Sequence, residues 1–288
     1  MRENNNYFKL RSYRKSFEKY TVGEKADTYI NLDFEMLKDL AVIDMRLRYT
    51  LLLFALDVEH FEKVKLLNVI SESSDDGYNI VNMFIDNLKG KEASDEKGRK
   101  PYTNLVNEIN RNKSSEYCGG IIDKYNGRYP AWAFVEVLPF GEFLSFLKFC
   151  ADYYNNNELK DEFYLLSDVK RLRNVAAHNN CMIFDLNLKS NLRYKTNYAV
   201  NRFISKDVGF NKDTRDRRMS NPAIRDIVTL LYVHWRIVKS DGVRQNQAKR
   251  IQSDIERCFR HIDYYKENEL IQATFEFLKK VVDKVTGV

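Results

Sequence analysis

One short segment of the chain combines residues that can cleave RNA without a metal ion. Leu172-Arg173-Asn174-Val175-Ala176-Ala177-His178 sets an arginine, an amide and an imidazole among small or β-branched residues. An imidazole can take the proton of a 2′-hydroxyl or protonate a leaving 5′-oxygen, and a guanidinium can hold the phosphate at two points. Arg173, Asn174 and His178 are therefore the candidate catalytic residues, with Asn174 able to orient the imidazole or contact the phosphate.

A straight helix does not bring this set together. Five residues correspond to about 500° of helix rotation, so Arg173 and His178 lie roughly 140° apart around the axis, whereas Asn174 and His178 share a face. The arrangement makes most sense at a cleft where a second copy of the chain supplies the complementary group. An exposed arginine and a histidine favoured by the dipole of a helix C-terminus explain the same residues equally well.

The remaining histidines and the cysteines offer less chemistry. Only His178 has an arginine five to seven residues upstream, so a site that needs two such motifs requires two chains. His234 lies on an apolar stripe and is expected in the core, and His261 belongs to a basic helix face. Cys118, Cys150, Cys181 and Cys258 have no zinc-ligand or redox-motif spacing. We expect buried, reduced thiols, no metal and no cofactor.

The composition predicts long helices. Glycine and proline contribute only 11 and 4 of the 288 residues, which leaves few turns. Glycine-rich nucleotide-binding sheets and many-turned sandwiches are therefore disfavoured, and an all-α fold is expected. The polar start at Met1–Asn6 lacks the apolar core of a signal peptide, and no apolar run approaches the roughly 20 residues needed to cross a bilayer. A cytoplasmic protein without a membrane partner is the expectation.

Helical periodicity is clearest over the first long predicted helix. Apolar residues recur at three- and four-residue steps from Asp33 to about Ile70. Asp44 and Arg48 interrupt this stripe four residues apart, as do Glu59 and Lys63. Charges on an apolar seam need partners, so these are expected to be structural ion pairs.

The rest of the chain also divides into helices. A charged loop is predicted at 90–101, and helices are predicted at about 103–117, 130–138, 143–154, 158–178, 220–238, 245–261 and 267–285. Residues 180–219 lose the helical period and are expected to form an irregular basic excursion with room for a short hairpin.

No break in composition along the chain marks a domain boundary. The prediction is one domain over 1–288, with a core at about 33–178 and a C-terminal basic helical extension at about 220–288.

Positive charge is concentrated in the second half of the chain. Residues 1–144 carry 21 basic and 23 acidic side chains, whereas 145–288 carry 26 and 18, for a net charge of +6. A polyanion would be attracted to the second half. The basic candidates are Lys189, Arg193, Lys195, Arg202, Lys206, Lys212, Arg215, Arg217 and Arg218 in the excursion, and Arg244, Lys249, Arg250, Arg257 and Arg260 on the following helix. A solvated surface explains the same charges about as well.

Five ordered blocks of the sequence resemble one family. They are Asn6-Tyr7-Phe8-Lys9-Leu10 through Tyr13; Asp44-Met45-Arg46-Leu47-Arg48; Val58-Glu59 with Lys63; Pro130-Ala131-Trp132 with Glu136 and Phe140-Gly141; and Leu172-Arg173-Asn174 with Ala177-His178. The last resembles the R-N-x-x-x-H motif of HEPN ribonucleases, and the whole set is similar to abortive-infection proteins of the AbiD/AbiF type. Asn179, Asn180 and Cys181 stand where many relatives have a second histidine followed by W-N.

The resemblance implies a fold and a function. The fold is a HEPN-like helical bundle that forms a homodimer, so that two R-N-x-x-x-H motifs make one composite site. The function is metal-independent endoribonuclease activity in anti-phage abortive infection, with toxin–antitoxin behaviour, and some members are associated with a small non-coding RNA. Glu136 is expected to support Arg173 or to stabilise packing. The alternatives are a HEPN protein that holds a regulatory RNA without cutting it, and a helical bundle that handles nucleotides or binds proteins.

Overall fold

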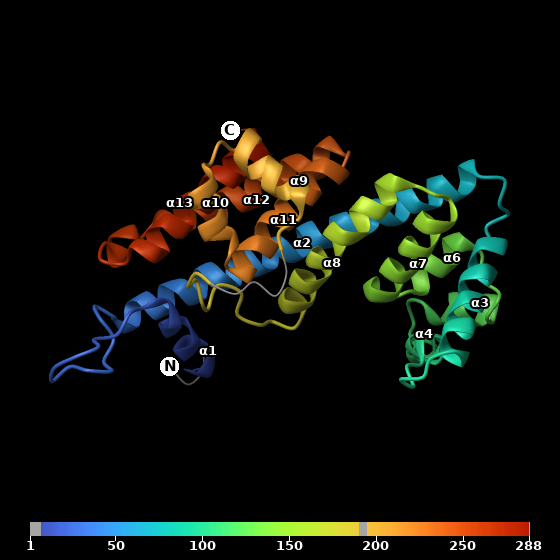
Figure 1. Cartoon of the computed structure of the whole chain (residues 1–288), viewed down its shortest axis with the longest axis horizontal. Coiled ribbons are helices and arrows are strands. Elements are labelled where there is room, and N and C mark those ends of the chain that lie inside the picture. The colour runs from blue at the N-terminus through green and yellow to red at the C-terminus, as the bar shows by residue number, and fades with distance from the viewer. Residues whose placement is uncertain (1–6, 190–194, 288) are drawn as a thin grey trace. The chain divides into compact units, whose positions relative to one another are not determined.

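The computed structural model describes residues 7–189 and 195–287 (Figure 1). Within those residues there are thirteen α-helices and no strand, with one isolated bridge between Lys19 and Tyr29. The all-α prediction is confirmed. The chain forms two compact units, one from Met1–Val58 and Asp168–Val288 and one from Glu59–Ser167. Asn6 and Arg193, singled out in the sequence, lie outside the described residues.

The unit that spans Glu59–Ser167 is built around aromatic side chains. It contains the end of α2 (Phe34–Glu72), then α3 (Asn79–Ala93), α4 (Pro101–Arg111), α5 (Gly119–Tyr125), α6 (Ala131–Val137), α7 (Phe140–Tyr153) and the start of α8 (Asn157–Ala177). Phe84, Phe134 and Phe146 lie in its core with ring centroids 5.2–6.1 Å apart. Such edge-on and tilted ring pairs are favourable beyond the area they bury.

The P-x-W block has a packing role in this unit. The backbone N–H of Ala131 donates to the carbonyl of Gly77 at 2.8 Å. Gly77 has a φ of +78°, and a Cβ there would lie 2.9 Å from the Trp132 ring. A side chain at this position would therefore clash as well as strain the backbone. Trp132 and Gly77 fit each other.

The second unit holds the candidate site. Its elements are α1 (Tyr7–Ser12), η1 (Tyr13–Ser16), α2 to Val58, the end of α8, α9 (Tyr198–Arg202), the π-helical turn η2 (Phe203–Asp207), α10 (Lys212–Met219), α11 (Pro222–Ile237), α12 (Asp241–Phe259), η3 (Ile262–Tyr265) and α13 (Glu269–Thr286). α11 is buried on nearly all sides, as expected of the central helix of a bundle. The C-terminal helices, orange to red in Figure 1, therefore share a core with the first part of α2.

Polar contacts fix α12 to α2. The Arg46 guanidinium pairs with Asp254 at 2.8 Å, and the Thr50 hydroxyl donates to the other oxygen of that carboxylate at 2.5 Å. Arg257 pairs with Asp39 at 2.5 Å in the interior. Arg257 was expected on an exposed basic face, and this was wrong because its guanidinium is needed to neutralise a buried aspartate.

Two predicted boundaries were wrong for identifiable reasons. The helix predicted over 103–117 ends at Arg111, and a turn follows at 112–118. A Cβ on Gly119 would lie only 2.4 Å from the Lys113 carbonyl oxygen, so the turn requires glycine at that position. The irregular excursion is shorter than predicted, since 198–219 is largely helical. Asn197 and Asn211, which suggested loops, are the N-caps of α9 and α10.

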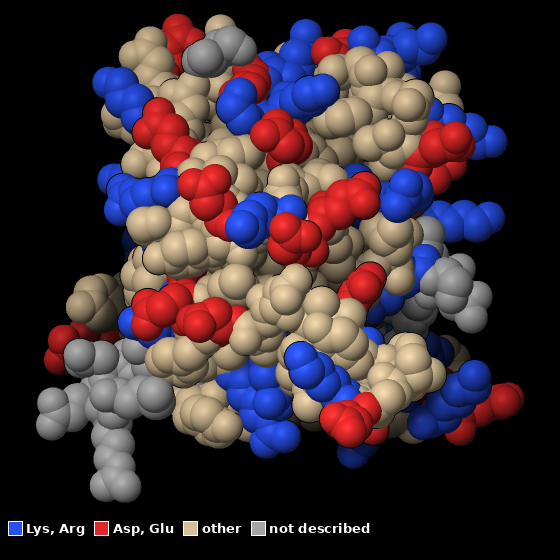
Figure 2. All heavy atoms as spheres, turned by 90° about the vertical axis from the view of Figure 1, so that its left-hand side faces the viewer, with Lys and Arg blue, Asp and Glu red and all other residues tan. Residues whose placement is uncertain are grey.

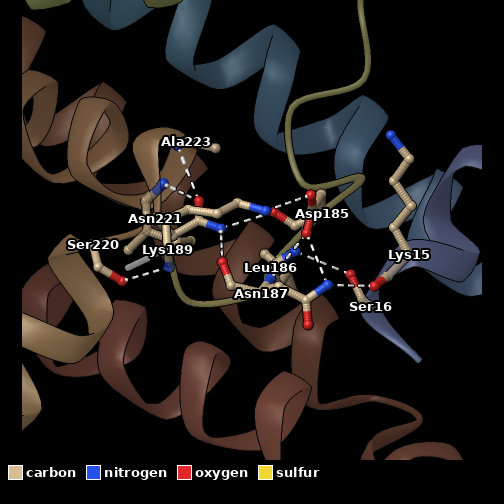
Figure 3. Close-up of polar contacts among 10 residues, drawn as sticks. Lys15, Ser16, Asp185, Leu186, Asn187, Lys189, Ser220, Asn221 and Ala223 are labelled. Carbon is tan, nitrogen blue, oxygen red and sulfur yellow. Dashed lines mark hydrogen bonds and ion pairs between the residues drawn. The ribbon is translucent and has the colours of Figure 1, made fainter. Parts of the chain in front are cut away.

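The remaining irregular segment, 180–189, is held by side chains on both sides (Figure 3). Asn221 donates from its amide to the carbonyls of Asp185 and Asn187 at 2.8 and 3.0 Å. The Leu186 N–H donates to the Ser16 hydroxyl, and the Lys189 N–H donates to the Ser220 hydroxyl, both at 3.1 Å. The segment has a fixed course without belonging to a helix.

Asn221 is expected to be among the most sensitive of the helix caps. Its side-chain oxygen also accepts the N–H groups of Ala223 and Ile224 at the start of α11, so Asn221→Ala removes four hydrogen bonds in a buried setting. We expect unfolding to become about 2–4 kcal/mol easier. Asn211→Ala is the matched control, because Asn211 caps the exposed α10 with one bond, and about 1 kcal/mol is expected there. Urea unfolding of both variants checks this, and equal losses would contradict it.

Candidate functional site

The three candidate residues lie at the end of α8, in the unit that contains α11. Arg173 and Asn174 are half-buried in the last turns of the helix, and the Arg173 Nη1 lies 3.4 Å from the Asn174 Oδ1. Arg171, on the same stretch, forms a two-point contact with Asp226 of α11 at 3.0 and 3.2 Å. Burial raises the pKa of Asp226, although the Arg171 charge opposes that shift. The contact holds the end of α8 on α11.

His178 follows the last helical residue, Ala177. Asn179 adopts a left-handed conformation with φ of 56°, and its N–H donates to the Ala176 carbonyl while the Asn180 N–H donates to the Val175 carbonyl, both at 3.0 Å. This pair of bonds is the Schellman ending of a helix, with asparagine in the position glycine usually takes. It leaves His178 at the C-cap, where its side chain is exposed. Among the described residues none is hydrogen-bonded or ion-paired to its ring.

A buried carboxylate anchors the segment that follows His178. Asp44 of α2 accepts the N–H groups of Met182 and Ile183 at 2.6 and 2.7 Å. Arg48 donates to Asp44 at 2.7 Å and to the Asn180 carbonyl at 3.2 Å. Burial raises the pKa of Asp44 against the opposing effect of these donors. The predicted Asp44–Arg48 ion pair is confirmed, and it holds both sides of the turn after the motif.

The N-terminal segment completes this anchor. The Tyr13 hydroxyl lies beside the Asp44 carboxylate, and burial next to that charge raises the pKa of Tyr13 strongly. Lys9 of α1 donates to the carbonyl of Asn179, the residue after His178. Three separate sequence blocks, around Tyr13, Asp44 and His178, therefore meet at one point.

These three blocks lie within a stretch that matches a known family. Residues 2–184 match the model of a family described as Abi-like protein, a stretch that contains all five blocks and the Asp44 anchor. The chain belongs to the Abi-like family. No curated protein and no solved structure matches it. Membership of this family supports a role in abortive infection.

Other histidines of this Abi-like protein have structural settings. His234 is buried, its Nε2 lies 3.2 Å from the Asp57 carboxylate, and its ring packs on Phe54. His261 stacks on Tyr264, with centroids 5.0 Å apart. His60, which is exposed, lies beside Phe61 in the other unit. These settings leave His178 as the histidine with both exposure and the motif.

Three further sequence predictions have mixed outcomes. Glu59 and Lys63 pair at 3.4 Å, as predicted. Glu136 is exposed on α6, so its carboxylate does not contribute to the core. The four cysteines are free thiols, but only Cys150 and Cys258 are buried, and burial raises the pKa of Cys258 to about 12.

The parts of the chain that the structure describes contain no candidate metal site and no candidate membrane span. No group of three His, Cys, Asp or Glu side chains there could hold a metal ion. None of the helices in 7–189 and 195–287 is long and apolar enough to span a bilayer.

A large groove of the Abi-like protein does not include the motif. It measures about 930 Å³ and lies between the segment after η1, the start of α13 and the end of α10. Its lining carries both signs of charge, for example Arg217 and Arg218 against Glu267 and Glu269. Lys, Arg, Asp and Glu are likewise interspersed on the side of the molecule drawn in Figure 2. This groove therefore does not have the uniform positive charge that suits a polyanion.

The sequence did not predict a second apolar stripe on α2. Val42, Met45, Tyr49, Leu52 and Leu56 recur at three- and four-residue steps on the side of the helix away from its buried face, and all but the half-buried Leu52 are exposed. The sequence did contain a signal for this stripe, because α2 has more apolar positions than one buried face requires. Tyr49 lies under the Arg48 guanidinium, 5.9 Å from the ring centroid. The stripe is therefore next to the residues that anchor the motif.

Proposed function

We propose that this Abi-like protein is a metal-independent HEPN endoribonuclease, and that its toxic activity in abortive infection is the cutting of RNA. The observation that carries the proposal is the state of His178. Its imidazole is exposed on a turn whose backbone is fixed by Asp44, Arg48 and Lys9. A catalytic imidazole needs this combination of access and fixed position.

The proposed reaction is attack of a ribose 2′-oxygen on the adjacent phosphorus. The bond from phosphorus to the 5′-oxygen breaks, which leaves a 2′,3′-cyclic phosphate on one product and a 5′-hydroxyl on the other. His178 of one copy takes the proton from the 2′-hydroxyl, and His178 of the second copy gives a proton to the leaving oxygen. Arg173 holds the phosphate while its negative charge is redistributed.

A second copy is proposed because one chain has one motif. The apolar stripe of α2 is the surface on which we propose that the copies meet. Tyr49 is 58% exposed within it, and contiguous exposed apolar side chains on a helix commonly mark an interface. The stripe adjoins Arg48, which bonds Asn180 two residues after His178. We therefore propose that pairing through this stripe brings the two motifs near one another.

Charge on the stripe is expected to separate the copies and stop cleavage. In the double variant Met45→Lys/Leu56→Lys, two positive charges per chain would face each other across an apolar interface, which is strongly unfavourable. Both side chains are exposed in the single chain, so folding is expected to survive. The oligomeric state is measured by analytical ultracentrifugation, and the rate of RNA cleavage is measured on the same samples. Val64→Lys, an exposed position further along α2, is the control and should remain dimeric and active.

The proposed chemistry is tested by incubating the purified protein with single-stranded RNA in the presence of a chelator. We expect cleavage to continue, with cyclic phosphate ends, and to stop at any site where the 2′-hydroxyl has been replaced by hydrogen. Cleavage of the 2′-deoxy site would refute attack by the 2′-oxygen. Saturable, salt-sensitive RNA binding without any product would instead favour a protein that holds a regulatory RNA, through basic residues such as Lys249, Arg250 and Arg260, which are exposed.

A further inference from the structure

The groove beside the start of α13 holds a buried cation that has no anionic partner. Arg218, at the end of α10, lines this groove of about 930 Å³ and is only 8% exposed. Its Nη1 donates to the Thr274 hydroxyl at 3.1 Å and to the Leu270 carbonyl at 3.4 Å, and both acceptors are neutral. Among residues 7–189 and 195–287, no carboxylate lies within ion-pair distance of this guanidinium. A buried charge without a counter-ion is unfavourable, so the position suits an anion from outside the chain.

The free edge of the Arg218 guanidinium is one that can bind a carboxylate at two points. Because Nη1 makes both bonds to α13, Nε and Nη2 keep their N–H groups for another acceptor. Two such N–H groups lie parallel in the planar guanidinium and match the two oxygens of a carboxylate. Burial and the neighbouring Arg217 charge lower the pKa of Arg218, whereas the Glu269 charge opposes this shift. The charge of Arg218 is therefore only partly compensated by the chain itself.

The walls of the groove are fixed by the chain. Asn268 caps α13 and donates from its amide to the Ser16 carbonyl at 3.0 Å. Ser16 also accepts the Leu186 N–H, as Figure 3 shows, so the segment after η1 and the segment 180–189 hold each other. The 18-residue α13 begins at the groove, and the positive end of its dipole lies beside Arg218. A site whose walls are held before binding loses little entropy when an anion arrives.

The remainder of the groove favours a ligand that also carries a positive charge. Its lining has three basic side chains, of which only Arg218 is buried, and four acidic ones, Glu18, Asp263, Glu267 and Glu269. All four acidic side chains are exposed, so they form a rim of negative charge around the buried guanidinium. The rim repels a polyanion such as RNA. A molecule with one carboxylate and a nearby amine is complementary to both the rim and Arg218.

We propose that this groove binds the C-terminal end of a peptide, with the terminal carboxylate on Arg218 and a lysine or arginine side chain against the acidic rim. Half-buried Met36 and Leu270 provide apolar surface for the last side chain of the peptide. The volume is at the upper end of that of small-ligand sites, so it accommodates several residues rather than one. Capture of a terminal carboxylate by fixed donors is a known mode of peptide recognition. The proposal does not depend on RNA cleavage.

The test is fluorescence anisotropy of the whole protein with labelled tetrapeptides that end in lysine followed by leucine, methionine or phenylalanine. We expect saturable binding of the free acids. Amidation of the terminal carboxylate should weaken binding about tenfold or more, because a charged two-point contact is lost. Arg218→Lys keeps the charge but not the paired donors, and should weaken binding of the free acids by a similar factor. Equal binding of acids and amides, or no saturable binding of the acids, would overturn the proposal.

A second variant keeps the test decisive if thermal unfolding shows that Arg218→Lys does not fold. Glu267→Lys changes an exposed position of the rim, and should weaken binding of the lysine peptides about threefold or more. The same variant should strengthen binding of peptides that carry glutamate in place of lysine. Glu256→Lys, exposed on α12 outside the groove, is the matched control and should change neither affinity. Equal effects of Glu267→Lys and Glu256→Lys would show that net charge governs binding, and would contradict the proposal.

Discussion

Replacement of His178 by alanine is expected to slow RNA cleavage about 10²- to 10⁴-fold, the usual contribution of a positioned acid or base. The expected effect on stability is small, because the ring is exposed and the helix ending is made by backbone bonds of Asn179 and Asn180. Rates are measured on a labelled single strand, and unfolding is followed with urea. A slow but normally stable variant is the predicted outcome.

His60→Ala provides the matched control for this prediction. His60 is also an exposed histidine, but it has no arginine five to seven residues upstream. Its variant should cleave at the unaltered rate. If His178→Ala also cleaved at that rate, the chemistry would have to lie elsewhere in the molecule.

Asp44→Ala is expected to give the largest loss of stability, about 3–5 kcal/mol. The substitution leaves the Arg48 guanidinium buried without its carboxylate, and it removes the acceptor for the Met182 and Ile183 N–H groups. A buried charge or N–H group destabilises the fold most when only its partner is removed, because the group then stays buried without a hydrogen bond. RNA cleavage should fall as well, since the turn after His178 loses its anchor.

The control for Asp44→Ala is a substitution in the first turn of α2. Glu35 pairs with Lys38 at 2.8 Å on the surface, so Glu35→Ala should cost less than about 1 kcal/mol. Equal losses for Asp44→Ala and Glu35→Ala would show that the buried network is not important for stability. Guanidinium unfolding curves for the two variants give the comparison.

The pH dependence of stability offers a second check on Asp44. Burial raises its pKa above the value in the unfolded chain, so folding is coupled to proton uptake. Its contribution to stability is therefore fully present below the unfolded pKa and declines as the pH rises through the folded pKa. Asp44→Asn, which is neutral at every pH, should remove this decline and cost less than Asp44→Ala.

Local periodicity accounts for much of the fold that could be predicted. The buried apolar face of α2, the Asp44–Arg48 pair at four-residue spacing and the Asn221-Pro222 start of α11 are all determined by residues close together in the sequence. Periodicity does not reveal which residue of another element a side chain will contact. Nothing near Asp44 in the sequence indicates that its second oxygen accepts N–H groups from residues 182 and 183.

Asparagine was the most misleading residue type. Asn197 and Asn211 stand in a polar stretch that predicts a loop, yet each accepts a backbone N–H and begins a helix. The same residue type favours loops, N-caps and left-handed helix endings, as at Asn179. Which role applies depends on the apolar residues that the next segment can bury, and these are few and widely spaced at 198–219.

The place of the candidate residues on their helix could be predicted, but the contact of that helix with α11 could not. Arg173 and Asn174 are indeed on the last turns of a helix, and His178 lies at its end. The Arg171–Asp226 contact and the exposed stripe from Val42 to Leu56 came only from the structure. The contact depends on which helices pack together, and the stripe depends on which face of α2 remains uncovered after packing.

The most direct measurement of the central claim is the activity of a mixed dimer. Unaltered chains and chains carrying Arg173→Ala/His178→Ala are co-expressed with different tags, and the mixed dimer is purified through both tags. A composite site needs the motifs of both copies, so the account predicts that the mixed dimer does not cleave single-stranded RNA. Half of the unaltered activity in the mixed dimer would mean that each chain has a complete site of its own, and would contradict the account.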